Sequence, residues 1–435
     1  MRDLVMRDQI VGRDAELQAT SAFLRDMAGG PAGLVFTGEP GIGKTTLWRH
    51  AIGQARHDRS IGVLSARPVA ADARYGYAVL GDLFGSMPSG LLAWLPWAQQ
   101  HSLAAALLRG SAGEGIDPRV VGAAVVGVLT EMCRPGPVLV AIDDAQWLDR
   151  PSGRVLAFAA RRLGCLPVGF LTCDETGADQ KIELDLDREL QESPVTKCAL
   201  GPLTAAELRQ IAKSQTGRAL PPTALAQIGQ AAGGNPFYAV EVARSFPDAP
   251  PPEEVVAPVP ESLNEVIAAR LAQLPDLARR ALLPLAVLRY PTVDVVAAGI
   301  GAPYSATELA LEQAAAAGIA ERNVYAFRVT HPLYASVVYS TTPPPERRLV
   351  HRRLAAALHD MEERACHLAP GAERPDAELA ENLDAAARHA DARGASDTAA
   401  DLTEQARELT PPDQIVDVER RKIQGAEYRR HALEP

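Results

Sequence analysis

The chain has 435 residues, of which 47% are hydrophobic and 23% charged, and its formal net charge at pH 7 is −10. One hydrophobic core rarely serves so long a chain, so two to four domains are expected. No apolar run approaches the roughly 18 residues of a membrane span, and no run of about five basic residues marks a nucleic-acid surface. These features exclude a membrane-spanning protein and argue against direct DNA binding.

The N-terminal segment and the cysteines bear on the compartment. Residues 1–17 mix charges of both signs and lack the apolar stretch of a secretory signal, so we expect a cytoplasmic protein. The five cysteines are odd in number and scattered, and no CxxC pair indicates zinc or a redox dithiol. Reduced, mostly buried thiols are therefore expected.

The first 200 residues predict an α/β domain. A helical pattern over 14–28 precedes a short apolar strand that ends in a glycine turn at 31–40, and a second helical pattern covers 45–56. Apolar runs bounded by glycine or proline predict further strands at 61–67, 137–144 and 167–174. Because helical patterns separate the strands, the sequence favours a parallel sheet.

Residues 201–258 predict a small helical lid that leads into a linker. Helical patterns cover 203–217, where Thr204 is a capping residue, and 222–234, which ends in a glycine pair. The proline-rich stretch 245–262 is expected to be extended and poorly packed. A second part of the protein is expected to follow it.

Residues 259–345 and 346–435 predict two further helical domains. In the first, alternating residues around Asn323 indicate a small β-hairpin among helices, a combination typical of a winged helix. In the second, two alanine-rich helices around Gly394 predict an αα-hairpin. Small residues at the crossing positions resemble a tetratricopeptide unit, so this region is expected to begin a helical repeat.

The sequence GEPGIGKT at 38–45 lies between a predicted strand and a predicted helix. Gly38, Gly41 and Gly43 allow the backbone to wrap a phosphate, so that N–H groups and the helix N-terminus point at the anion. Lys44 is expected to reach the β- and γ-phosphate oxygens, and the Thr45 hydroxyl to ligate Mg²⁺. The sequence therefore predicts an α/β P-loop NTPase that binds ATP or ADP with Mg²⁺.

An acidic pair should complete this site. Asp143 and Asp144 follow the apolar run VLVAI, at the end of a predicted buried strand. We assign Asp143 to the Mg²⁺ shell and Asp144 to orienting the attacking water, so the catalytic candidates are Lys44, Asp143 and Asp144. The alternative for Asp144, or for Asp149, is the cap of the next helix.

With these motifs the chain resembles the STAND class of signal-transduction ATPases, and in particular the large ATP-binding regulators of the LuxR family that include the maltose regulator type. The resemblance covers nearly the whole chain. It rests on VGRDAEL (11–17), GEPGIGKTTL (38–47), IDDAQWLD (142–149), GGNPFYAVE (233–241) and FRVTHPLYASVVY (327–339).

The resemblance implies an adenine pocket between the Val11, Gly12 and Arg13 backbone and Pro236. It also implies that His331 of the winged helix lies near the β-phosphate, where a cationic or donating imidazole would hold an ADP-bound closed state. The residues expected at the nucleotide are Val11, Gly12, Arg13, Gly38, Glu39, Pro40, Gly41, Ile42, Gly43, Lys44, Thr45, Thr46, Pro236 and His331.

The chain departs from this family in two places. Many relatives carry an arginine at the end of the strand after the acidic pair, whereas here the residues are Cys173, Asp174 and Glu175. Hydrolysis is then expected to be very slow or absent unless Arg161, Arg162 or a neighbouring subunit supplies the cation. The DNA-binding helix-turn-helix at the C-terminus of family members is also missing, which indicates either the N-terminal half of a regulator or a free-standing ATPase that acts through a partner.

Three hypotheses about function remain at this point. The first is a switch in which ADP holds the P-loop domain against the winged helix, and ATP opens a hinge at 245–262 and permits self-association. The second is a scaffold that binds nucleotide without hydrolysing it and acts through a partner protein. The third is a constitutive ATPase with fast turnover, which the missing arginine argues against.

Overall fold

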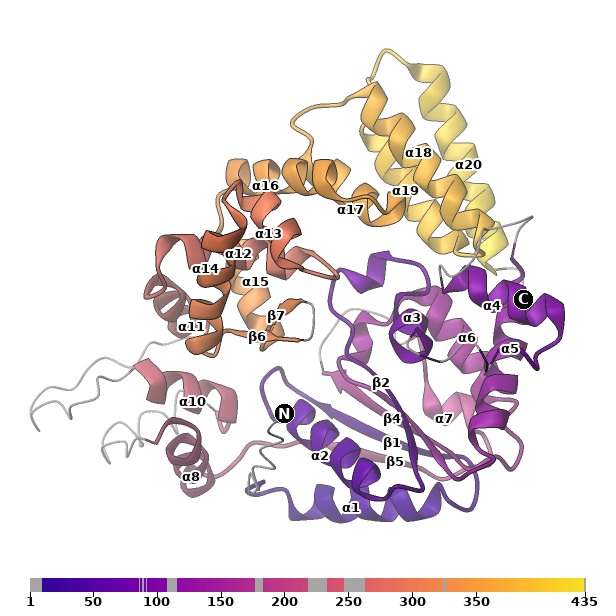
Figure 1. Ribbon diagram of the computed structural model, residues 1–435, viewed down its shortest axis with the longest axis vertical. Coiled ribbons are helices and arrows are strands. Elements are labelled where there is room, and N and C mark those ends of the chain that lie inside the picture. The colour runs from indigo at the N-terminus through magenta and orange to yellow at the C-terminus, as the bar shows by residue number, and fades with distance from the viewer. Residues whose placement is uncertain are drawn as a thin grey trace, which may run out of the picture.

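The computed structural model describes residues 10–85, 87, 90, 92–107, 116–176, 183–217, 233–245, 263–323 and 326–433. Figure 1 shows the chain running from an α/β domain through the lid helices to a helical domain with a short hairpin, and then through further helices that return to the α/β domain. Within this described part, none of the helices combines the length and the apolar character that a bilayer span requires.

The α/β domain is built on a five-stranded sheet in the order β2-β3-β4-β1-β5, in which every neighbouring pair is parallel. This confirms the predicted parallel sheet. Its elements are α1 (Asp14–Asp26), β1 (Ala32–Gly38), α2 (Lys44–His57), β2 (Gly62–Ala66), η1 (Asp72–Arg74), α3 (Ala78–Phe84), α4 (Trp97–Ala106), α5 (Pro118–Met132), β3 (Val138–Ile142), η3 (Ala145–Trp147), α6 (Arg150–Ala160), β4 (Val168–Glu175), α7 (Leu186–Glu189) and β5 (Val195–Ala199).

Alternate side chains of the strands supply the cores on the two faces of the sheet. On one face, Leu34 and Phe36 of β1 pack with Leu47 of α2 and with α1. On the other, Val35 of β1 and the even-numbered residues of β3, such as Val140, pack against the helices α3 to α6. This three-layer arrangement places the carboxyl ends of all the parallel strands at one edge of the sheet.

The strand β5 was not predicted. Its residues Val195–Ala199 pair with β1 at the border of the sheet and are mostly half-buried or exposed, with Lys197 in the middle. An edge strand of this kind lacks the continuous apolar run by which the other strands were recognised.

The lid and the winged helix follow the sheet. Thr204 caps α8, as the sequence predicted, and it forms a capping box with Glu207. Residues 222–232 of the expected helix at 222–234 and residues 246–262 of the expected linker lie outside the described residues. The elements here are α8 (Ala205–Thr216), α10 (Pro236–Ser245), α11 (Leu263–Ala272), α12 (Asp276–Val287), α13 (Val293–Ile300), α14 (Tyr304–Ala316), β6 (Ala320–Arg322), β7 (Phe327–Val329) and α15 (Pro332–Thr341).

The strands β6 and β7 form the predicted antiparallel hairpin, and the helices α11 to α15 share an apolar core with it. The remaining helices are α16 (Pro344–Ala357), α17 (Met361–Gly371), α18 (Ala377–Ala392), α19 (Ser396–Glu408) and α20 (Ile415–Leu433). Gly394, with a φ of +77°, makes the turn of the predicted αα-hairpin between α18 and α19.

The C-terminal helices pack directly on the α/β domain, an arrangement that the sequence did not predict (Figure 1). Residues of α18 and α19, such as Leu383 and Ala399, belong to the same apolar cluster as Leu80 of α3 and Val125 of α5. The buried guanidinium of Arg393 reinforces the contact by donating to backbone carbonyls of the α/β domain.

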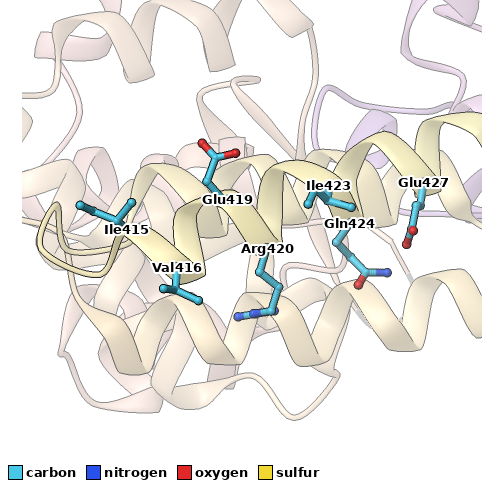
Figure 2. Close-up of a pocket in the computed structure, with 7 residues that line it drawn as sticks. All are labelled: Ile415, Val416, Glu419, Arg420, Ile423, Gln424 and Glu427. Atoms are coloured by element: carbon cyan, nitrogen blue, oxygen red, sulfur yellow. The ribbon is translucent and has the colours of Figure 1, made fainter.

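The outer face of α20 points away from this contact. Figure 2 shows its apolar and polar side chains side by side along the helix. Ile415, Val416 and Ile423 are exposed there. The residues drawn are Ile415, Val416, Glu419, Arg420, Ile423, Gln424 and Glu427.

Candidate nucleotide-binding site

The loop GEPGIGKT joins β1 to α2 at the carboxyl edge of the sheet. Gly41 and Gly43 have φ values of +78° and +111°, a left-handed conformation that glycine adopts without strain. A β-carbon on Gly41 would also lie 2.7 Å from the β-carbon of Phe237 and 3.0 Å from Oδ1 of Asn235. The loop therefore needs glycine both for its turn and for the close approach of the lid.

Lys44 begins α2 and lies under the loop. Its Nζ donates hydrogen bonds to the carbonyl oxygens of Gly38 at 2.7 Å and Glu39 at 2.9 Å, and the side chain is buried. Thr45 and Thr46 follow in the first turn of α2, where N–H groups have no partner within the helix. The N-terminus of α2 thus offers donors and a partial positive charge to an anion in the loop.

Asp143 and Asp144 follow β3 at the same edge. The Asp143 side chain is fully buried, yet neither carboxylate oxygen accepts a hydrogen bond of normal geometry. Burial raises the pKa of Asp144 to about 6, and the neighbouring Asp143 adds to this rise, whereas Arg67 and Lys44 oppose it. Asp144 also has a φ of +47°, which is uncommon for a residue other than glycine.

The alternative role of these acids as helix caps applies to Asp149. Its carboxylate accepts hydrogen bonds from the backbone N–H of Ser152 at 2.9 Å and of Tyr77 at 2.8 Å. Asp149 therefore caps α6 and holds the chain before α3. Asp144 precedes the short helix η3 but makes no capping hydrogen bond with its side chain.

Arg67 is a member of this site that the sequence analysis missed. Its Nε lies 3.1 Å from Oδ2 of Asp143, and its side chain is 9% exposed. Arg67 follows β2, which pairs with β3 so that Ala66 lies opposite Ile142. Its position after a strand at the carboxyl edge of the sheet is the signal that could have identified it.

The end of β4 carries the acids Asp174 and Glu175 after Cys173. Cys173 is buried, and burial raises the pKa of its thiol well above the ordinary value. Burial raises the pKa of Asp174 to about 6 and also raises that of Glu175. The strand therefore brings no cation to the site, as the sequence indicated.

Arg161 and Arg162 do not replace that cation within this chain. They follow α6 and precede β4, so they lie at the amino edge of the sheet, at the opposite end from the P-loop. Arg161 pairs with Glu189 at 2.5 Å, and the guanidinium of Arg162 lies over the ring of Phe158. Among the residues that the structure describes, Arg67 is the arginine that forms ion pairs with Asp143 and Asp144.

The segment Val11–Gly12–Arg13 lies beside the P-loop. The Arg13 guanidinium donates to the carbonyl oxygens of Ile42 at 3.0 Å and Gly201 at 2.8 Å. A β-carbon on Gly12 would collide with Glu207 of the lid, at 2.5 Å from its Oε1. These residues therefore join the loop to the beginning of the lid.

The lid contacts the loop from the other side through the GNP sequence before α10. The Asn235 side chain donates to the Pro40 carbonyl at 2.8 Å, and the backbone N–H of Phe237 donates to the Gly41 carbonyl at 3.3 Å. Pro236 lies between them as the first residue of α10. Asn235 and Phe237 belong to the motif at 233–241, but no role was predicted for them.

His331 connects the winged helix to this group. Its ring stacks on that of Phe237, with centroids 4.1 Å apart, and its Nδ1 accepts a hydrogen bond from the N–H of Leu333 at the start of α15. Burial, together with the positive charges of Arg67 and Lys44, lowers the pKa of His331 to about 3. A neutral ring that accepts at Nδ1 carries its proton at Nε2, so it can donate but is not cationic.

The arrangement fits a magnesium–nucleotide complex. A fully buried carboxylate that accepts no hydrogen bond of normal geometry is a hard anionic oxygen ligand, which Mg²⁺ prefers. Asp143 and Thr45 would hold the ion, which would neutralise phosphate charge. The loop amides and Lys44 would bind the phosphates.

The parallel sheet with its phosphate-binding loop is the fold of a P-loop NTPase, and this fold implies nucleotide binding. Residues 9–171 match the AAA ATPase domain family. The structure is similar to the crystal structure of the signal transduction ATPase with numerous domains (STAND) protein with a tetratricopeptide repeat sensor from Pyrococcus horikoshii. That likeness has a TM-score of 0.55 and 15% identity, and it covers 96% of this chain and 58% of that chain.

Two further similarities are weaker. An uncharacterized protein of Rhizobium meliloti (strain 1021) is 26% identical over 275 residues, which make up 59% of this chain and 26% of that protein. The Walker-type ATPase of Pyrococcus abyssi has a TM-score of 0.36 and 13% identity, over 77% of this chain and 97% of that chain. This chain thus spans about a quarter of the Rhizobium protein and 58% of the Pyrococcus horikoshii protein.

Proposed function

We propose that this chain is a signal-transduction ATPase that changes state with the adenine nucleotide it holds. ADP attaches the P-loop domain to the winged helix, exchange for ATP releases it, and the released form associates with itself or with a partner protein. One observation carries the proposal: Gly41 of the loop contacts Phe237 of the lid, whose ring stacks on His331 of the winged helix. Three parts of the chain therefore meet at the phosphate-binding loop.

Each part has a role in this proposal. The loop 38–46 and the N-terminus of α2 bind the phosphates, with Lys44 as the cation, while Thr45 and Asp143 hold Mg²⁺. The adenine lies between the backbone of Val11 to Arg13 and Pro236, and the neutral His331 donates from Nε2 toward the β-phosphate. The contact of Arg13 with Ile42 and that of Asn235 with Pro40 support this placement, because they bring both sides of the pocket to the loop.

Differential affinity has to drive such a change of state. Moving a population from 1:99 to 99:1 needs about 5.5 kcal/mol between the affinities of the ligand for the two states. A phosphate that contacts the loop, the lid and the winged helix in one state, but only the loop in the other, can supply such a difference.

Hydrolysis is proposed to be slow. Asp144 would orient the attacking water, but β4 ends in Cys173, Asp174 and Glu175, which cannot stabilise the charge that develops on the phosphate. Slow hydrolysis would return the protein to its ADP state. The motifs shared with LuxR-family regulators further support the proposal that the chain is the regulatory ATPase portion of such a protein, located in the cytoplasm, with DNA binding outside this chain.

The test is nucleotide binding with a matched pair of lysine variants. Lys44→Ala removes the proposed phosphate contact and should weaken ADP binding roughly tenfold or more, because hydrogen bonds from charged donors contribute about 1.5–3 kcal/mol. Lys213→Ala removes an exposed lysine of α8 and should leave the affinity unchanged. Titration with a fluorescent ADP analogue measures both, and equal affinities in the two variants would overturn the proposal.

A second candidate function is a scaffold that binds nucleotide without hydrolysing it. The acids at the end of β4 favour it, because the chain lacks the usual cation there. Light scattering in ADP and in ATP separates the candidates: the switch requires a larger assembly in ATP, and the scaffold requires the same assembly in both. Sequence-specific binding of DNA by this chain would contradict both candidates.

A further inference from the structure

Arg67 lies between the proposed metal ligand and the winged helix. Its Nε is 3.1 Å from Oδ2 of Asp143, and on its other side Nη2 donates to the Thr330 carbonyl at 3.3 Å. Its Nη1 lies 3.5 Å from Oε1 of Glu321 on β6. One guanidinium therefore contacts Asp143, which follows β3, and two residues of the winged-helix hairpin: Glu321 on β6 and Thr330 directly after β7.

Glu321 forms ion pairs with arginines of both the α/β domain and the winged helix. Arg67 and Arg49 approach it from the α/β domain, Arg49 at 3.8 Å, and Arg328 approaches it from β7 at 2.5 Å. Within the described part of the chain, Arg67 is the member of this group that also pairs with Asp143. It therefore links two acids that belong to different parts of the protein.

A divalent cation bound to Asp143 would compete with the Arg67 guanidinium for the same carboxylate. The carboxylate makes no hydrogen bond of normal geometry, so its charge is balanced mainly by the ion pair with Arg67. A second cation bound to it would repel the guanidinium across a few ångströms in a site that excludes most water. The guanidinium geometry that reaches Thr330 depends on the same ion pair, because the fork of donors is rigid.

We propose that Arg67 is a positioning residue that couples metal binding at Asp143 to the attachment of the winged helix. Mg²⁺ at Asp143 weakens the hold of Asp143 on Arg67, and Arg67 then loosens its contacts with Thr330 and Glu321. By thermodynamic reciprocity, the attached winged helix lowers the affinity of Asp143 for Mg²⁺ by the same factor. This inference rests on the proposed function, since it takes Asp143 as a metal ligand.

The first test is a Mg²⁺ titration of ADP binding. Arg67→Ala removes the competing cation, so its ADP complex should need about five- to tenfold less Mg²⁺ at the midpoint than the unaltered chain. Arg49→Ala is the matched control, because Arg49 and Arg67 both pair with Glu321, whereas of these two it is Arg67 that pairs with Asp143. Its midpoint should stay within about twofold, and an equal midpoint in all three proteins would overturn the inference.

The second test is hydrogen exchange of the peptide 319–334 with and without millimolar Mg²⁺. In the unaltered chain Mg²⁺ should speed exchange by roughly fivefold, whereas in Arg67→Ala exchange should be fast in both conditions. Arg67→Lys serves if the alanine variant does not fold, because one ammonium cannot bridge Asp143 and Thr330 and should likewise remove the response. An unchanged response in these variants would contradict the coupling.

The two proposals can fail separately. If ADP does not bind under any condition, the proposed nucleotide function fails, whereas exchange with Mg²⁺ alone still tests Arg67. If ADP binds but substitution of Arg67 changes neither the Mg²⁺ midpoint nor the exchange response, the coupling fails and the nucleotide function stands.

Discussion

The α/β domain makes two contacts with the rest of the chain, and they differ in kind. Toward the winged helix it presents charged and aromatic groups, among them Arg67, which pairs with Glu321, and Asp72, which pairs with Arg289 at 3.0 Å. Toward the C-terminal helices it presents an apolar surface that merges with α18 and α19 into one core. A contact made of charges can respond to a charged ligand, whereas an apolar core opens only by exposing its surface to water.

The charged contact is the one at which the winged helix can separate from the α/β domain. The winged helix is joined to the C-terminal helices through α16 and α17, which pack against each other. Because α18 and α19 share a core with the α/β domain, a released winged helix would remain tethered through this pair of helices. Four predictions test the difference between the two contacts.

Arg393→Ala should have the largest effect on stability. Its guanidinium is 1% exposed and donates to Glu362 at 2.8 and 2.6 Å. Its removal leaves Glu362 buried without its main partner, which should lower the free energy of unfolding by about 3–5 kcal/mol. Urea denaturation followed by circular dichroism measures the loss.

Arg407→Ala is the control for this prediction. It breaks an ion pair with Glu404 in which both side chains are more than a third exposed, so it should cost less than about 1 kcal/mol. Similar losses in Arg393→Ala and Arg407→Ala would show that the C-terminal contact is held no more firmly than a surface pair.

The packing of α16 on α17, which joins the winged helix to the C-terminal helices, should be sensitive to acid. His351 and His367 are buried with their Nδ1 atoms 2.8 Å apart, and burial lowers their pKa values to about 4 and about 3. The unfolded chain therefore binds protons more readily than the folded chain. Stability from the neutral pair is present above pH 6.5 and is lost as the pH falls toward 4, and the two histidines together should cost roughly 3 kcal/mol at pH 5.5.

The contribution of this histidine pair has to be measured as a difference in the free energy of unfolding between two proteins. Asp72, with a pKa raised by burial to about 7, and Asp174 act in the opposite direction over part of the same range. Urea denaturation at several pH values should therefore compare the unaltered chain with the double variant His351→Gln and His367→Gln. If both lose stability equally between pH 6.5 and 4.5, the pair is not responsible.

Gly76→Ala should separate the C-terminal helices from the α/β domain. An added β-carbon would lie 2.4 Å from that of Ala395, and neither atom can move without its backbone. Overpacking of this kind should cost about 2 kcal/mol and should increase hydrogen exchange in α19. Gly53→Ala is the control, because its β-carbon would meet no atom within 4 Å and alanine favours the helix. A stable variant with protected α19 would contradict the tight contact.

Glu321→Gln should have the smallest effect on overall stability. Its side chain is 32% exposed, so the loss of its ion pairs should cost about 1 kcal/mol or less. Hydrogen exchange of the peptide 319–334 should nevertheless rise, because the winged helix loses its partner across the boundary. Glu312→Gln breaks an exposed pair with Arg322, which joins two residues of the winged helix, and should leave the exchange unchanged. A loss as large as that of Arg393→Ala would remove the distinction between the two contacts.

The parts that could be predicted from the sequence are those that local residues determine. The loop 38–45 carries its own turn glycines, and the buried strands are continuous apolar runs, so the sheet and its phosphate loop were recognised. Asn323 and Gly394 likewise marked turns that the structure contains or flanks. In each case the physical cause lies within a few neighbouring residues.

The missed features depend on residues that are distant in sequence. The role of Arg67 depends on its ion pair with Asp143, which follows the next strand. The role of Arg393 depends on Glu362 and on carbonyls of the α/β domain. The sequence of an alanine-rich helix does not indicate which surface the helix packs against. The contact of α18 and α19 with the α/β domain therefore could not be predicted from their own residues. The strand β5 was missed because its exposed face hides the apolar pattern.

The left-handed backbone of Asp144 has a practical consequence for mutagenesis. Asparagine tolerates a φ of +47° about as well as aspartate does, whereas alanine and β-branched residues do not. Alanine scanning at this position would therefore combine a lost carboxylate with a distorted turn. Asp144→Asn removes the charge and keeps the shape of the chain, so it is the replacement that tests the proposed role of this carboxylate separately from the turn.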